Sequence, residues 1–213
     1  EKERVYDAVL VSIGRKPNAV NLGLEQIGVQ VTKGYIDVKP NLQTTVPHIY
    51  AIGDVIGQPM LAHKASHEAR VAVDSILGKS VAFTPRAIPA VMFTDPEVAW
   101  CGVTETEAKQ KGMNVKIEKF PWLASGRALT LGRAEGFTKL ICDATSGILL
   151  GAAIIGVNAG DMISECVLAI EKQLTFKDIA HTIHPHPTLS ETIMEAAELV
   201  GGACVHLAPR RKL

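Results

Sequence analysis

The pattern of apolar and polar positions divides the chain into two parts. In the first part, residues 9–14 and 48–54 are short apolar runs that end in a glycine or a Gly-Asp pair. Such runs are typical of strands that are buried on both faces. Residues 35–38 alternate like an exposed strand, and residues 61–77 are Ala-rich with apolar positions at helical spacing. The second run and the Ala-rich segment therefore predict a strand, a polar loop and a helix, in that order.

Beyond a junction at residues 78–86 the predicted strands come first, with one short helix among them, and the other helices follow. The apolar runs predict strands at residues 90–93, 98–101, 115–117, 138–141 and 148–155. Helical spacing predicts helices at residues 104–108, 160–173, 176–180 and 190–199. Grouped strands with helices set apart from them predict an α+β domain from about residue 88 onward.

The predicted helices carry recognisable start and stop residues. Thr104 and Glu107 have the spacing of a capping box. Thr175 and Ser190 stand where N-cap side chains are expected. The pair Gly201-Gly202 follows the last helix and is expected to terminate it, because glycine adopts the left-handed conformation that ends many helices.

Composition and charge narrow the class of protein without identifying it. The 213 residues suffice for one large domain or two small ones. Lys and Arg total 22, and so do Asp and Glu. This balance gives no electrostatic footprint for nucleic acid or for an anionic membrane surface. No apolar run approaches the roughly 20 residues that a membrane-spanning helix needs. We expect a cytoplasmic protein that binds neither nucleic acid nor membrane.

The four cysteines are scattered along the chain, at Cys101, Cys142, Cys166 and Cys204. They form no C-x-x-C pair and show no zinc-like spacing. We expect buried thiols in a reducing cytoplasm, with no metal site and no redox-active pair among them.

The segment from His184 to Glu191 carries the most concentrated chemistry. It holds two histidines, two prolines and a carboxylate five positions after His186. A histidine fixed beside a carboxylate can shuttle protons near neutral pH. A His-Pro bond also adopts the cis form more readily than other peptide bonds. The alternative is a proline-rich turn whose histidines cap the helix that follows, and the local chemistry leaves both interpretations open.

A second candidate site lies at residues 53–63. Asp54 follows Gly53 at the end of a predicted strand, where a carboxylate can accept hydrogen bonds from the hydroxyl groups of a ligand. The helix that begins at residues 60–63 has free N–H groups and a positive dipole end, which suit an anionic or polarised ring oxygen. The alternative is a Gly-Asp turn followed by an ordinary helix start.

Three motifs together resemble the flavin disulfide oxidoreductase family: residues 51–54 (AIGD), 60–63 (MLAH) and 186–191 (HPTLSE). They stand in the family's order and approximate spacing, and the resemblance covers the whole chain. Residues 60–63, together with residues 96–99, 120–122 and 125–128, resemble the branch of the family that oxidises dihydrolipoamide.

The resemblance implies three domain segments. Residues 1–14 would be the last strand of an NAD-binding domain, and residues 15–87 the C-terminal part of a FAD-binding domain. Residues 88–213 would form the interface or dimerisation domain. The expected fold is thus an α+β domain with an antiparallel sheet and helices, preceded by a remnant of the α/β FAD-binding domain.

The resemblance also implies a role for each candidate residue. His186 would be the acid–base catalyst, Glu191 its orienting carboxylate, and the His186-Pro187 bond would be cis. For His184 it implies no more than packing beside the site. Asp54 would hold the ribityl hydroxyls of FAD. The other cofactor-binding residues would be Gly14, near the nicotinamide nucleotide, and Gly53, Met60, Leu61, Ala62, His63 and Pro187, near FAD.

The activity so implied is the oxidation of protein-bound dihydrolipoamide, with FAD and an active-site disulfide, and the transfer of its electrons to NAD⁺. A neutral imidazole would take the thiol proton, since the thiolate is the reactive form. The enzyme would be a homodimer in which His186 serves the partner's active site. Lipoyl domains of 2-oxo acid dehydrogenase complexes would be its other partners.

The chain departs from the family in what it lacks. It contains neither the glycine-rich flavin fingerprint nor the redox-active cysteine pair. We therefore expect the C-terminal part of a longer enzyme, inactive alone, whose FAD-domain remnant is mobile or packed on a neighbouring chain. Two alternatives remain: another disulfide reductase, of the glutathione or mercuric type, and a non-catalytic dimerisation module.

Overall fold

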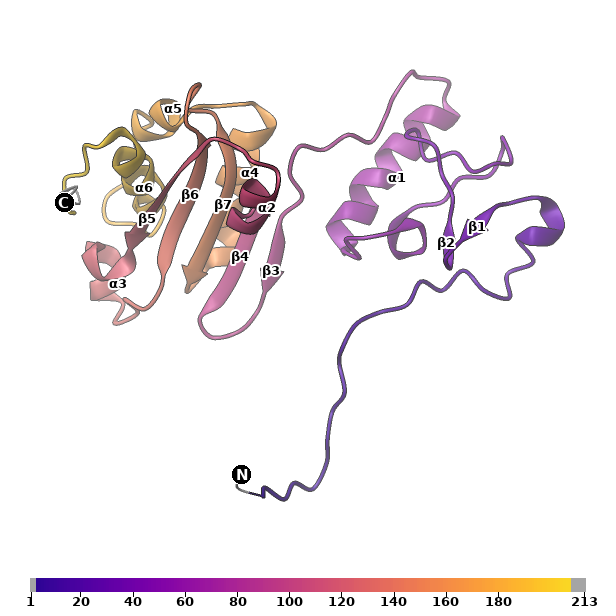
Figure 1. The fold of residues 1–213 in the computed structure, drawn as a ribbon, viewed down its shortest axis with the longest axis horizontal. Coiled ribbons are helices and arrows are strands. Elements are labelled where there is room, and N and C mark those ends of the chain that lie inside the picture. Colours follow the sequence, from indigo (N-terminus) through magenta and orange to yellow (C-terminus); the bar gives the residue numbers. More distant parts are fainter. Residues whose placement is uncertain (1–2, 208–213) are drawn as a thin grey trace. The chain divides into compact units, whose positions relative to one another are not determined.

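The computed structural model describes residues 3–207 and divides the chain into two compact units, Glu1–Thr84 and Pro85–Leu213 (Figure 1). The described residues form no helix that is both long and apolar enough to cross a membrane. Each unit is built around its own cluster of buried apolar side chains.

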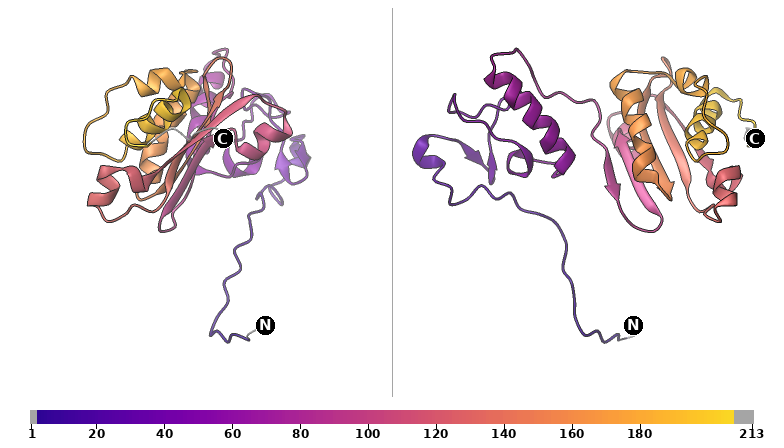
Figure 2. Two further views of the ribbon diagram at one scale, coloured as in Figure 1. Left: turned by 60° about the vertical axis from the view of Figure 1, so that its left-hand side comes forward. Right: turned by 180° about the vertical axis from the view of Figure 1, so that it is seen from behind.

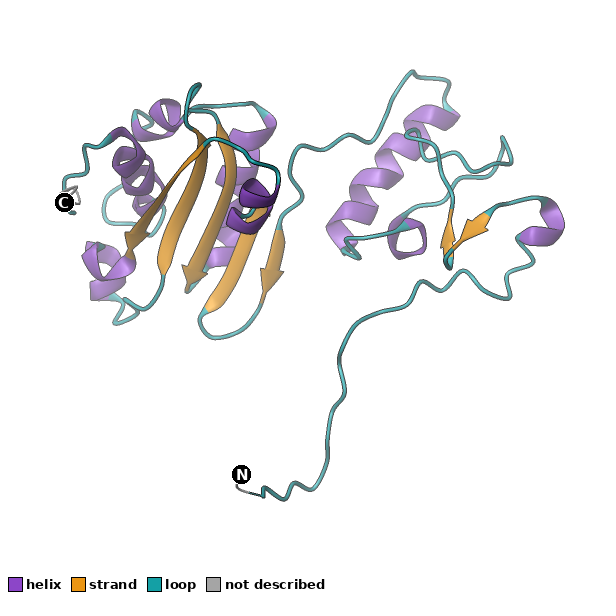
Figure 3. Cartoon of the chain, in the orientation of Figure 1, coloured by secondary structure: helices purple, strands orange, loops and turns teal. Residues whose placement is uncertain are grey.

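The second unit is built on a five-stranded antiparallel sheet (Figure 3). Its strands lie in the order β3-β4-β7-β6-β5. Their bounds are β3 (Ala90–Met92), β4 (Glu97–Gly102), β5 (Val115–Pro121), β6 (Phe137–Asp143) and β7 (Leu149–Gly156). Residues of β7 alternate between buried and partly exposed from Ala152 to Gly156, so one face of the sheet is covered.

Two long helices cover that face (Figure 2). Helix α4 (Ala159–Glu171) packs on β4 and β7, and α6 (Glu191–Gly201) packs on β5 and β6. The remaining helical elements are α2 (Glu105–Gln110), η3 (Trp122–Ala124), α3 (Gly126–Thr130) and α5 (Phe176–Ala180). These helices and the antiparallel sheet confirm the α+β domain predicted from the sequence.

A buried chain of hydrogen bonds fastens α6 to the sheet. The Trp122 indole N–H donates to the Thr138 hydroxyl of β6 over 3.0 Å. That hydroxyl lies 2.7 Å from the hydroxyl of Thr192 in the first turn of α6. The Thr192 hydroxyl also donates to the Leu189 carbonyl over 2.7 Å. All of these polar groups are buried and paired, so they fix the start of α6 at low energetic cost.

Tight packing around Trp122 requires a glycine on the neighbouring strand. Gly156 has a φ of 153°, and a Cβ added there would overlap the Trp122 ring. The six-membered ring of the indole therefore lies directly against the end of β7, where another side chain would displace it.

The first unit is smaller and holds few strands. It contains η1 (Glu25–Ile27), a two-stranded sheet of β1 (Val31–Thr32) and β2 (Tyr35–Ile36), η2 (Gly53–Ile56) and α1 (Ala62–Ile76). The Ala-rich segment thus forms the predicted helix. The core of this first unit is built on Ala19, Val29, Ile36 and Ala51.

Two strands predicted in this unit do not form. Residues 9–14 have no strand structure, and Leu10 and Ile13 are at least 90% exposed. Residues 48–54 form only an isolated bridge, between Gln43 and Tyr50, before residues 53–54 enter η2. A strand requires a neighbour to pair with its N–H and C=O groups. Among the described residues of this unit, residues 9–14 find no such neighbour, and residues 48–54 find only the short segment around Gln43. The burial that the apolar pattern predicted for residues 9–14 is also wrong, because no neighbouring element of the described unit covers these side chains.

Candidate active site

His186 and Glu191 form a hydrogen-bonded pair at the start of α6. The Nδ1 atom of His186 lies 2.9 Å from Oε1 of Glu191. The other carboxylate oxygen, Oε2, accepts the Thr188 N–H over 2.8 Å. Both oxygens of Glu191 are therefore engaged, and the carboxylate cannot rotate without breaking a bond. A carboxylate held in this way fixes the imidazole that it contacts.

The loop before α6 has its own internal bonds. The His186-Pro187 peptide bond is cis. The Thr188 hydroxyl donates to the Pro185 carbonyl over 2.7 Å and lies 2.9 Å from the Ser190 hydroxyl. Ser190 is the N-cap residue of α6, but its side chain makes no capping bond to the helix. The predicted Ser190 cap is wrong in this respect, because the hydroxyl bonds to Thr188 instead.

The pair combines an exposed base with a shielded carboxylate. The His186 side chain is 75% exposed, whereas that of Glu191 is 18% exposed. Burial acts to raise the pKa of Glu191, but the Thr188 N–H, the His186 ring and the charge of His206 together hold that pKa below its ordinary value. Glu191 is thus an anion at neutral pH and accepts the Nδ1 proton. The Nε2 atom of His186 is then the basic one.

His184 belongs to a different contact. Its side chain is 5% exposed, and Nε2 lies 2.8 Å from Oε1 of Glu165 in α4. Its Nδ1 lies 2.8 Å from the Thr182 carbonyl. Both ring nitrogens are engaged within the second unit, so His184 has no free ring nitrogen with which to accept a substrate proton.

In the first unit, Gly53 and Asp54 open helix η2. Gly53 has a φ of 78°, and an added Cβ would lie 3.2 Å from the Ala65 side chain. The Asp54 carboxylate is 44% exposed and lies 3.5 Å from the Arg15 guanidinium. An accessible carboxylate beside a close-approach glycine fits the predicted contact with ligand hydroxyls.

A buried ion pair that the sequence analysis missed supports this turn. Glu68 Oε2 accepts the Gly53 N–H over 2.7 Å, and Glu68 Oε1 lies 2.6 Å from Lys64 Nζ. Both side chains are almost fully buried in α1. Their four-residue spacing on one helix was the available signal, since such residues share a face.

The remaining candidates have mixed placements. Met60 and Leu61 lead into α1, whose first turn contains Ala62 and His63. Leu61, the N-cap residue, makes no side-chain capping bond. This helix end therefore keeps the positive dipole that suits a polarised ring. Gly14 lies in the extended segment with a φ of 145° and nothing within 4 Å of an added Cβ. Gly53 and Asp54 thus both lie in η2, whereas Gly14 lies in the extended segment, outside any helix or strand.

The cysteines do not form a redox pair. All four are free. Burial raises the pKa of Cys101 and of Cys142 to about 12, and it raises that of Cys166 well above the ordinary value. Thiols of this kind are inert, because the thiolate is the nucleophile.

Comparison with known protein families places these observations in context. The model described as pyridine nucleotide-disulphide oxidoreductase, dimerisation domain, matches residues 88–197. The model described as pyridine nucleotide-disulphide oxidoreductase matches residues 1–69.

Individual relatives agree with the family models. The chain is 51% identical to a dihydrolipoyl dehydrogenase of Haemophilus influenzae over 95% of its own length and 42% of that protein. It is 52% identical to one of Geobacillus stearothermophilus over 94% of its length and 43% of that protein. The crystal structure of LpdA from Mycobacterium tuberculosis matches with a TM-score of 0.82 and 31% identity, covering 88% of this chain and 41% of that one. The chain thus spans less than half the length of the curated relatives it matches.

Proposed function

Because this chain belongs to the pyridine nucleotide-disulphide oxidoreductase family, we propose that it is the C-terminal part of a dihydrolipoyl dehydrogenase. The proposal depends on one observation above all: His186 is exposed, while its partner Glu191 is shielded and held through both oxygens. Identity near 50% to proteins of that name supports the same assignment.

The chemistry of the pair suits a dithiol substrate. A dithiol reacts with a disulfide only after one thiol has lost its proton. The Nε2 atom of His186 accepts that proton, and the charge then placed on the ring faces the Glu191 carboxylate. Because Thr188 holds the second oxygen of Glu191, the ring keeps its orientation while the proton moves.

The residues around Asp54 and the start of α1 would hold FAD in the full-length protein. FAD, when bound there, supplies the two-electron chemistry that links the dithiol to NAD⁺. The fit rests on the accessible Asp54 carboxylate, the Gly53 turn and the uncapped start of α1.

We further propose that the full-length protein works as a homodimer and meets lipoyl domains at the resulting site. The dimerisation-domain match supports pairing. The four free cysteines include no redox pair, so His186 requires a disulfide that this chain does not carry. A cytoplasmic location is consistent with four unpaired thiols.

The proposal is tested by the substrate preference of the full-length protein. We expect rapid NADH formation from dihydrolipoamide and NAD⁺, followed by NADH fluorescence. Reduction of glutathione disulfide or of mercuric ion with NADPH is the matched comparison. Faster turnover of either would assign the protein to another branch of the family, and no turnover of any of the three would favour a non-catalytic dimerisation module.

A further inference from the structure

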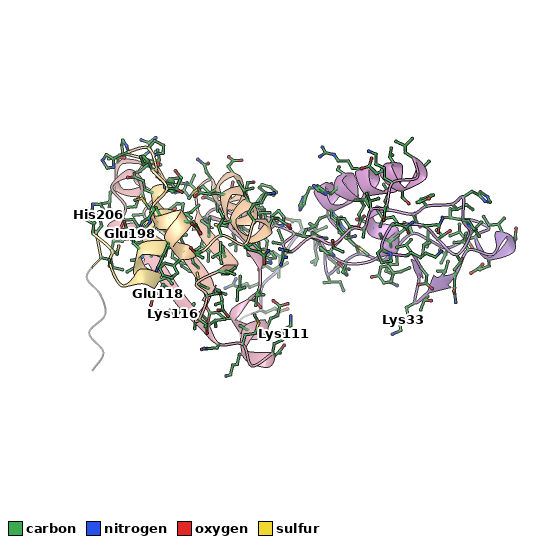
Figure 4. All side chains as sticks on the ribbon, turned by 90° about the horizontal axis from the view of Figure 1, so that it is seen from above. Lys33, Lys111, Lys116, Glu118, Glu198 and His206 are labelled. Atoms are coloured by element: carbon green, nitrogen blue, oxygen red, sulfur yellow. The ribbon has the colours of Figure 1, made fainter. Side chains whose placement is uncertain are left out.

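A cluster of potential metal ligands lies at the end of α6, apart from the His186–Glu191 pair. We call it the C-terminal cluster, and it consists of Glu195, Glu198, Cys204 and His206. Figure 4 labels Glu198 and His206 at this end of the second unit. The inference does not rest on the proposed function, because the cluster contains neither member of the pair, although the charge of His206 acts on Glu191.

The chain path explains why these residues meet. Gly202 ends α6 in the left-handed conformation, with a φ of 82°. The Ala203 N–H then donates to the Glu198 carbonyl, so the chain turns back along the helix. As a result the Cys204 thiol lies 3.0 Å from Oε2 of Glu195, although nine positions separate them in the sequence.

The ligand atoms of three members are close enough to share one cation. One oxygen each from Glu195 and Glu198 and the sulfur of Cys204 all lie within 4.8 Å of one another. The two carboxylates stand three positions apart on α6 and therefore share a face of the helix. The thiol reaches the two carboxylates from a separate segment, so the grouping is more than a pair of acidic residues on one helix.

Burial gives a second, independent argument. Glu195 is 5% exposed. Oε2 of Glu198 is buried and has no hydrogen-bond partner among the described residues. A buried carboxylate oxygen without a partner is costly, and a neighbouring second carboxylate adds repulsion. A bound cation would relieve both costs.

We infer that Glu195, Glu198 and Cys204 bind one Zn²⁺ ion. A thiolate ligand favours Zn²⁺ over Mg²⁺ or Ca²⁺, which prefer oxygen ligands only. On binding, the Cys204 thiol loses its proton to solvent and its sulfur coordinates the metal. His206 hydrogen-bonds through Nδ1 to Oε1 of Glu195 and is a positioning residue that orients this carboxylate.

The scattered cysteines predicted no metal site, because they lack the paired cysteine or histidine spacing that is common in zinc sites. The proposed ligands instead combine a helical Glu-x-x-Glu with a thiol on the segment after the helix. Only the reversal at Gly202 brings them together.

The test is a Co²⁺ titration of the 213-residue chain, with Co²⁺ as a spectroscopic substitute for Zn²⁺. We expect a thiolate-to-cobalt charge-transfer band in the near ultraviolet that saturates at one equivalent, and Zn²⁺ should abolish it. Cys204→Ser should lack the band, and Glu198→Gln should weaken binding. His206→Gln should weaken it by about 10- to 100-fold while keeping the band.

Glu118→Gln is the matched control, because it removes a carboxylate from β5, outside the cluster. Circular dichroism of each variant shows whether it folds. In addition, Zn²⁺ should raise the unfolding temperature of the unaltered chain and not that of Cys204→Ser. Absence of the band in the folded, unaltered chain would overturn the inference. Persistence of the band in Cys204→Ser would do the same.

Discussion

Replacing His186 by Gln in the full-length protein is expected to lower the turnover of dihydrolipoamide by about 10²- to 10⁴-fold, the range for loss of a general base. Gln keeps a polar side chain at the loop but cannot accept the thiol proton at neutral pH. Because His186 itself is not among the residues expected to hold FAD, flavin content should be unchanged. The measurement is steady-state NADH formation beside the flavin absorbance of the purified variant.

Glu191→Gln separates orientation from proton transfer. This variant removes the negative charge that faces the His186 ring, so we expect a smaller loss of turnover than for His186→Gln. Near-normal turnover of His186→Gln would contradict the assigned role of the histidine.

Gly156→Ala is expected to destabilise the second unit strongly. The added Cβ would overlap the Trp122 ring, and Gly156 has a φ of 153° that side-chain-bearing residues rarely adopt. Overpacking and backbone strain together should lower the free energy of unfolding by about 2 to 5 kcal/mol. Chemical denaturation of the 213-residue chain measures the loss.

Gly112→Ala is the matched control for backbone strain. Gly112 has a φ of 61°, but nothing lies within 4 Å of an added Cβ. Its substitution should cost only the strain, about 1 kcal/mol. Equal losses for the two variants would mean that the contact with Trp122 does not limit this position. A larger loss is expected for Gly156→Ala, because displacement of the Trp122 ring also disturbs the bonds through which Trp122 and Thr138 hold α6.

Local sequence signals predicted the second unit well. The capping box of Thr104 and Glu107 is present, and the Thr175 hydroxyl caps α5 as expected. Gly202 ends α6 in the left-handed conformation. These features depend on residues within one turn of a helix, so the sequence contains all the information they need.

The features that the sequence did not predict depend on distant partners. Residues 9–14 have the apolar pattern of a strand, but pairing needs a neighbour outside the run. The bond from Gly53 to Glu68 joins a turn to a helix, and that from Cys204 to Glu195 depends on a chain reversal. The His186–Glu191 pair could be named as a candidate because only five positions and one loop separate its members, although the local chemistry left its role open.

The central claim is that His186 serves an active site whose disulfide lies on the partner subunit. It is tested most directly with a heterodimer of two full-length inactive subunits. One carries His186→Gln, and the other carries serines in place of the cysteine pair expected in the N-terminal half. Each homodimer alone should be inactive. The heterodimer has one complete site if the histidine acts across the interface, so it should recover about half of the unaltered turnover. If the histidine acted within its own subunit, both sites would stay defective, and a heterodimer without activity would contradict the account.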